Sequence, residues 1–179
     1  MDQIIFRPEG FEKLYEKFKS LDTAAKVEVK KEFNASALKI QSTAKKLAPV
    51  NFGNLRNSII LSEVGDEKDF VFTVAAKAKY APYVEFGTGS KVSVPSNYQD
   101  YAAKFKGKTN GTFKQMIEAL MLWVQRKGIS GKNDRQTAYL IARSILRKGI
   151  RPQPFMIPAF EQEKPKLLKR LKEILNAKS

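Results

Sequence analysis

Glu85 is a carboxylate crowded by three aromatic residues, a proline and two glycines in the run Tyr80-Ala81-Pro82-Tyr83-Val84-Glu85-Phe86-Gly87-Thr88-Gly89. Catalysis by a carboxylate needs a second acid or base at the site, and none recurs near Glu85 in the sequence. We therefore interpret the run as a fixed structural corner. Its aromatic residues and Val84 lie at turn-like spacing, and Gly87 and Gly89 allow a sharp exit from the turn.

The chain contains no Cys and no His. Disulfides, Cys- or His-bound metals, cysteine nucleophiles and imidazole bases are therefore excluded. Carboxylate, Lys, Tyr or Ser chemistry remains, as does a metal bound by oxygen ligands alone. We accordingly expect neither an enzyme nor a cofactor.

The formal net charge of +15 is concentrated in the middle of the chain. Residues 87–160 hold 13 Lys and Arg against 3 Asp and Glu, whereas residues 1–86 hold 14 against 12. A segment of one sign favours a polyanion or an acidic protein surface as partner, although a solvated basic face with no specific partner has the same composition.

The length of 179 residues suits one domain, which we expect to span 1–179 with residues 90–150 as a basic helical insertion. No apolar run approaches the roughly 20 residues that cross a bilayer, and the start of the chain does not resemble a secretory signal. We expect a soluble protein that stays inside the cell that makes it.

The elements expected before the corner are mostly helical. A short strand at 4–7 and a helix at 11–18 precede a long helix that begins after Asp22 and ends before Pro49. Residues 57–64 and 69–76 then predict an antiparallel hairpin, whose half-buried face the long helix would cover.

After the corner, residues 90–111 predict a long exposed loop. Thr112 and Asp134 are expected N-caps of two amphipathic helices that end at Gly128 and Gly149, forming a helical hairpin. A DNA-binding helix-turn-helix is the alternative, but the connection 128–133 is long for that motif. A proline-rich run at 150–160 leads into a last helix from about Pro158, which Pro165 should kink or restart. The fold class is α+β: a long N-terminal helix on a small antiparallel sheet, with a C-terminal helix.

Three separated segments resemble motifs of one family. They are Ala-Pro-Val-Asn-Phe-Gly-Asn-Leu-Arg-Asn-Ser-Ile at 48–59, Tyr-Ala-Pro-Tyr-Val-Glu-Phe-Gly-Thr at 80–88, and Pro-Gln-Pro-Phe-Met-Ile-Pro-Ala-Phe at 152–160. In this order they resemble the bacteriophage tail-component family of long-tailed phages and prophages. These neck or tail-completion proteins are related to the minor tail protein Z of lambda-like phages.

The resemblance implies a structural role at the head-to-tail junction of the virion. The expected partners are other phage neck, tail or connector proteins, with the chain itself in a homo-oligomeric ring. The protein would be made in the bacterial host cytoplasm and reside in the virion neck or tail, without contact with a membrane. Residues 90–150 depart from short family members and are expected to be an insertion.

The motif residues are expected to be structural: glycines for special backbone angles, apolar residues for packing and prolines for chain direction. They are Pro49, Gly53, Leu55, Arg56, Ser58, Tyr80, Val84, Glu85, Gly87, Thr88, Pro154, Phe155, Pro158 and Ala159. We further expect a partly buried ion pair between Arg56 and Glu85.

The alternative function is nucleic-acid binding by the basic segment 87–160, with non-specific contact to DNA. Tyr98 and Tyr101 stand beside basic residues there, and aromatic rings can stack on bases while cations neutralise phosphates. The expected polyanion or partner contacts are Lys104, Lys106, Lys108, Arg126, Lys127, Arg143, Arg147, Lys148 and Arg151.

Overall fold

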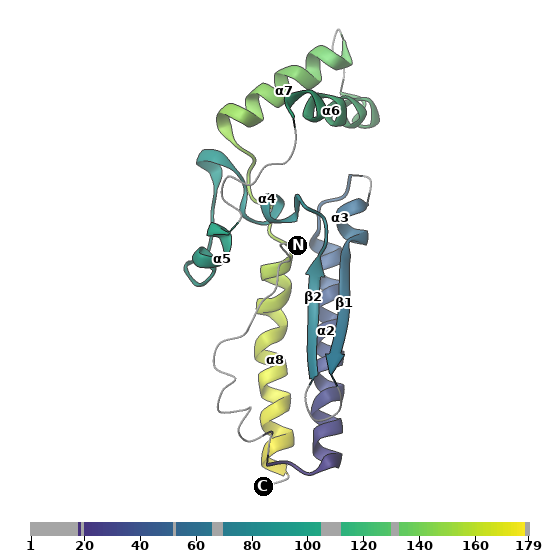
Figure 1. The fold of residues 1–179 in the computed structure, drawn as a ribbon, viewed down its shortest axis with the longest axis vertical. Helices are drawn as coiled ribbons and strands as arrows, with labels where there is room; N and C mark the ends of the chain where they lie inside the picture. The colour runs from purple at the N-terminus through teal and green to yellow at the C-terminus, as the bar shows by residue number, and fades with distance from the viewer. Residues whose placement is uncertain are drawn as a thin grey trace. The chain divides into compact units, whose positions relative to one another are not determined.

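The computed structural model describes residues 18, 20–51, 53–65, 70–104, 112–129 and 133–177. These residues form an α+β fold, as predicted, with several helices and a two-stranded antiparallel sheet (Figure 1). The chain divides into two compact units, one made by the residues up to Ala81 together with those from Pro154, the other by Pro82–Gln153. Some predicted elements lie outside the described residues: the strand at 4–7, nearly all of the helix at 11–18 and most of the hairpin turn.

The long helix α2 spans Thr23–Leu47 and organises the first unit. Asp22 caps it, since its Oδ1 accepts a hydrogen bond of 2.6 Å from the Ala25 amide, which confirms the predicted N-cap. Ala25, Val29, Ala37 and Ala44 are buried along one face. The helix ends before Pro49, as expected for a residue that disfavours helical backbone in its predecessor.

Strands β1 (Ile59–Gly65) and β2 (Phe70–Ala76) form the predicted antiparallel hairpin, in a register that pairs Ile59 with Ala76 and Gly65 with Phe70. The expected start of the first strand at 57 is wrong, because Asn54–Asn57 form a short helix, α3. Helix α2 contacts both strands and covers the sheet, as the half-buried pattern predicted.

The last helix, α8 (Met156–Ala177), packs along α2 and completes the core of the first unit. Val29, Leu167 and Leu171 form a buried cluster against which Phe33 and Phe70 pack, with 5.6 Å between the two ring centroids. Burial of each such side chain contributes about 1.5–3 kcal/mol. Helix α8 begins two residues earlier than predicted and continues through Pro165, so the predicted restart there is wrong.

The second unit consists of short helices and a helical hairpin. Helix α4 spans Ala81–Phe86, turns η1 and η2 span Gly89–Lys91 and Ser96–Tyr98, and α5 spans Gln99–Ala103. The loop predicted from residue 90 is therefore wrong at 90–91 and 96–103, where local hydrogen bonds form helical turns, whereas 92–95 is irregular as predicted.

Helices α6 (Phe113–Lys127) and α7 (Asp134–Lys148) pack together as the predicted helical hairpin. Thr112 and Gln115 form a reciprocal capping box at the start of α6, as expected for Thr112. The cap of α7 is Asn133, whose Oδ1 accepts from Arg135, and not the predicted Asp134. Val124 is fully buried, whereas the neighbouring Trp123 is only partly buried.

Candidate functional site

The first motif joins α2 to β1 in the first unit. Gly53 adopts φ +78° just before α3, a left-handed conformation that favours glycine. Leu55 is buried and anchors α3, and the Ser58 hydroxyl donates to the Leu55 carbonyl at 2.8 Å. These residues, with the half-buried Pro49, therefore shape a helix-to-strand connection and present no reactive group.

Arg56, in the same motif, is exposed, and its Nε donates to the Lys45 carbonyl at 2.9 Å. The sequence predicted that Arg56 forms a partly buried ion pair with Glu85. That expectation is wrong for Arg56, because its guanidinium lies at the surface and ties α3 to the last turn of α2.

The second and third motifs meet in the second unit. The Gln153 amide donates to the Val84 carbonyl at 2.7 Å, and the Thr88 amide donates to the Ile150 carbonyl at 3.0 Å. The Ile150 amide in turn donates to Thr88 Oγ1 at 2.8 Å. We refer to these contacts of Val84, Thr88, Ile150 and Gln153 as the clasp. It holds together two segments that are more than 60 residues apart in the sequence.

Two glycines make the clasp possible. Gly87 has φ +77°, and a Cβ there would come within 2.7 Å of the Ile150 carbonyl oxygen. Gly149 has φ +73°, and a Cβ there would overlap the Thr88 carbonyl. The two backbone segments of the clasp lie too close together to leave room for a side chain at Gly87 or Gly149. Both positions therefore require glycine for space as well as for the positive φ.

Glu85 is 1% exposed, so a dissolved substrate has no access to its carboxylate. Tyr80 was expected to pack, but it remains 46% exposed, and that expectation is wrong. Partial desolvation nevertheless raises the pKa of the Tyr80 hydroxyl above its ordinary value. Val84 is half-buried and contributes its carbonyl to the clasp.

The rest of the third motif starts α8 in the first unit. Phe155 and Met156 are fully buried, and Ala159 is 1% exposed. Pro158 lies in the first turn of α8, where a backbone amide has no hydrogen-bond acceptor within the helix, so a proline is tolerated. Pro154 is exposed just before the helix. This half of the motif supplies packing and chain direction.

A polar cluster between α2 and α8 was not anticipated from the sequence. The Ser36 hydroxyl donates to Glu163 Oε1 at 3.1 Å, and Arg170 Nη2 donates to both at 2.6 Å. Arg170 Nε donates to Glu32 Oε2 at 2.7 Å. The hydrogen bond to Glu163, reinforced by that to Glu32, raises the pKa of the Arg170 guanidinium. Glu163 and Arg170 are seven residues apart and thus share a face of α8, which is the one signal the sequence offered.

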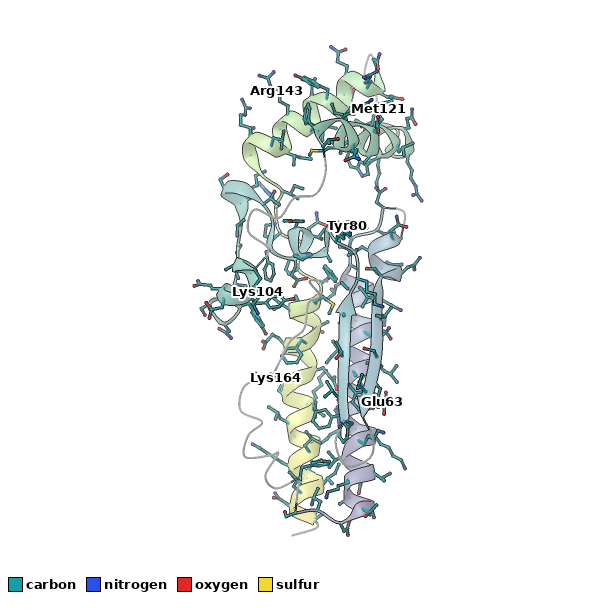
Figure 2. The ribbon with its side chains drawn as sticks, viewed as in Figure 1. Glu63, Tyr80, Lys104, Met121, Arg143 and Lys164 are labelled. Carbon is teal, nitrogen blue, oxygen red and sulfur yellow. The ribbon has the colours of Figure 1, made fainter. Side chains whose placement is uncertain are left out.

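Those expected polyanion contacts that the structure describes are exposed residues of the second unit. Arg126 and Lys127 occupy the last turn of α6, and Arg147 and Lys148 the last turn of α7, where cations complement the helix dipole. Arg143 and Arg151 are also exposed. Figure 2 labels Arg143 on α7 and Lys104 beyond α5. The Lys104 Nζ lies 5.8 Å from the centre of the Tyr101 ring, whereas Lys106 and Lys108 fall outside the described residues.

Within the described ranges, no three acidic side chains gather into a group that could hold a metal ion. No helix among them is long and apolar enough to cross a membrane.

Residues 12–87 match the family described as "Bacteriophage HK97-gp10, putative tail-component". This match covers the first motif and the second as far as Gly87. Comparisons with curated proteins and with solved structures gave no significant match. The resemblance drawn from the motifs is thereby confirmed: residues 12–87 are similar to a bacteriophage tail-component family.

Proposed function

We propose that the protein is a non-enzymatic structural subunit of the head-to-tail junction of a long-tailed phage or prophage. In this proposal it is a neck or tail-completion protein that assembles as a homo-oligomeric ring with other virion proteins. Head-to-tail contacts between copies close such rings, and they use two different surfaces of each subunit.

The clasp is the observation that carries this proposal. Gly87, Thr88, Ile150 and Gln153 are engaged in backbone contacts, and the buried Glu85 has no route to a substrate. A rigid scaffold of this kind suits a subunit that other proteins hold. We further propose that residues 90–150 are an insertion mounted on the clasp, because its ends meet at Thr88 and Ile150.

A phage that lacks the gene tests the role directly. We expect the mutant to accumulate filled heads and separate tails, which purified protein then joins into infectious particles. Normal particles without the protein would contradict the proposal.

Nucleic-acid binding is the second candidate. It is supported by the exposed Arg143, Arg147 and Lys148 on α7 and by the Lys104–Tyr101 contact. Cations beside an aromatic ring suit a polyanion whose bases can stack. On this reading the basic helices would contact DNA non-specifically as it passes through the neck.

A further inference from the structure

The solvent-facing side of α7 combines apolar and basic side chains. Ala138 and Ala142 are fully buried in the hairpin with α6, which leaves the opposite side of α7 to solvent. Six exposed residues on that side form what we call the α7 face: Arg135, Tyr139, Leu140, Arg143, Leu146 and Arg147. Leu140 and Leu146 are 59% and 67% exposed. Single exposed apolar residues are common, but three on one helix face among arginines are typical of an interaction surface.

Tyr139 is held in position by a second aromatic residue. Its ring meets that of Phe113 on α6 nearly at right angles, with 5.8 Å between the two centroids. Phe113 is 39% exposed and Tyr139 42%, so the pair presents apolar area to solvent. A side chain fixed in this way loses little conformational freedom when a partner binds. Aromatic and Arg side chains are also the usual anchors of protein interfaces, and the α7 face has both.

The charge of the α7 face specifies an acidic partner. Between residues 135 and 148 the sequence has three Arg and one Lys but no Asp or Glu. Arg is concentrated in this region, since five of the eight Arg in the chain lie at 126–151, against three of the 25 Lys. The guanidinium group of Arg pairs with a carboxylate through two parallel hydrogen bonds, a geometry that Lys lacks. Charge complementarity therefore calls for carboxylates opposite Arg143 and Arg147.

A second copy of the chain is a poor candidate for that partner. Two α7 faces would repel each other, because each carries three guanidinium groups and no carboxylate. In the first unit, Glu32 and Glu163 already pair with Arg170, and Glu63 pairs with Lys30. With a net charge of +15, the chain as a whole is also repelled by further copies unless another surface compensates.

Nucleic acid matches the charge of the α7 face but not its apolar side chains. Contacts with phosphates would leave Leu140 and Leu146 in water, because the backbone of nucleic acid is charged throughout. A protein surface in which carboxylates surround apolar side chains satisfies both requirements. The observations therefore favour a protein partner for this face.

We propose that the α7 face binds an acidic surface of another virion protein. Arg143 and Arg147 pair with its carboxylates, while Tyr139, Leu140 and Leu146 pack on its apolar side chains. This inference rests on the proposed virion role. It adds the chemistry of one neighbouring protein and the surface that receives it.

Joining of heads and tails in vitro tests the contact. Heads and tails from a phage that lacks the gene are mixed with purified protein, and the concentration that gives half of the maximal infectious titre is measured. Leu140→Ser with Leu146→Ser should raise this concentration about 30-fold, because it removes two apolar contacts and keeps every charge. Arg143→Glu with Arg147→Glu should raise it at least as much. Leu122→Ser is the matched control, since Leu122 is 58% exposed but lies on α6, and it should have no effect.

The outcomes separate this inference from its alternatives, with the fluorescence of Trp123 confirming that each variant is folded. Unchanged activity of both double variants would overturn the proposal. Loss of activity in the Arg variant alone would assign the face to a polyanion such as DNA and overturn it as well. An equal loss in Leu122→Ser would contradict the assignment to α7. Failure of the unaltered chain to join heads to tails would contradict the virion role itself, and the α7 contact with it.

Suppressor mutations identify the partner. A phage that carries Arg143→Glu with Arg147→Glu is passaged until infectious particles reappear. We expect the compensating changes to replace Asp or Glu by Lys or by a neutral residue in one other virion protein. Compensating changes found solely within this chain, reversion at the two altered positions apart, would indicate contact between copies and contradict the proposal.

Discussion

The Ser36 hydroxyl on α2 donates a hydrogen bond of 3.1 Å to Glu163 Oε1 on α8 and accepts one of 2.6 Å from Arg170 Nη2. Ser36 is 1% exposed and Glu163 6%, so these polar groups lie within the helix pair. Buried polar groups of this kind have few alternative partners. The cluster therefore favours one register of α8 along α2.

Replacement of Arg170 by Ala should lower the free energy of unfolding by about 3 kcal/mol, because it leaves Glu163 buried without its cation. Urea denaturation followed by far-UV circular dichroism measures the loss. Lys169→Ala is the matched control, since Lys169 is exposed on the same helix and should change stability by less than about 0.5 kcal/mol. Equal stability of the Arg170 and Lys169 variants would show that the cluster is energetically unimportant.

Gly149→Ala should destabilise the second unit by about 3 kcal/mol, since it adds a steric overlap with Thr88 to the strain of a positive φ. Gly128→Ala is the comparison: its φ is +59°, but no atom lies within 4 Å of the added Cβ. There only strain remains, about 1 kcal/mol. Trp123 is the sole tryptophan and lies on α6, so its fluorescence reports unfolding of this unit. Equal losses at the two positions would contradict the tight clasp.

The proposed insertion predicts that residues 90–148 can be removed. Because Thr88 and Ile150 are hydrogen-bonded, a short Gly/Ser link between Gly89 and Gly149 should close the gap without strain. We expect the shortened chain to retain the helical signal of α2 and α8 and to unfold cooperatively. Loss of that cooperative transition would mean that the removed residues are an integral part of the domain.

Nucleic-acid binding has a distinct signature in its salt dependence. If Arg143, Arg147 and Lys148 each neutralise a phosphate, replacing all three by Gln should reduce the slope of log affinity against log salt by about 2.7. Fluorescence anisotropy with duplex and single-stranded oligonucleotides gives this slope. Undetectable binding by the unaltered chain near about 50 mM salt would eliminate this second function.

Local signals in the sequence were sufficient for the main elements. Asp22 and Thr112 marked helix starts because a capping side chain acts within three residues of itself. The alternation of apolar residues on β2 predicted the hairpin, because one face of the sheet packs on α2. These features depend on neighbours in the sequence and therefore leave a readable pattern.

The remaining features depend on distant partners. The Ser36–Glu163 bond spans 127 positions, and nothing near Ser36 in the sequence indicates it. Gly149 was correctly expected at a helix end, but its fit against Thr88 is a tertiary property. Tyr80 was expected to pack because its neighbours are aromatic, yet it lies just before α4 and is 46% exposed.

The most direct test of the account locates the protein in the particle. A tag at the chain terminus, decorated with its antibody fragment and imaged by electron microscopy in infectious particles, should give density encircling the junction between head and tail. Density elsewhere in the particle, or particles that carry no tagged protein at all, would contradict the central claim.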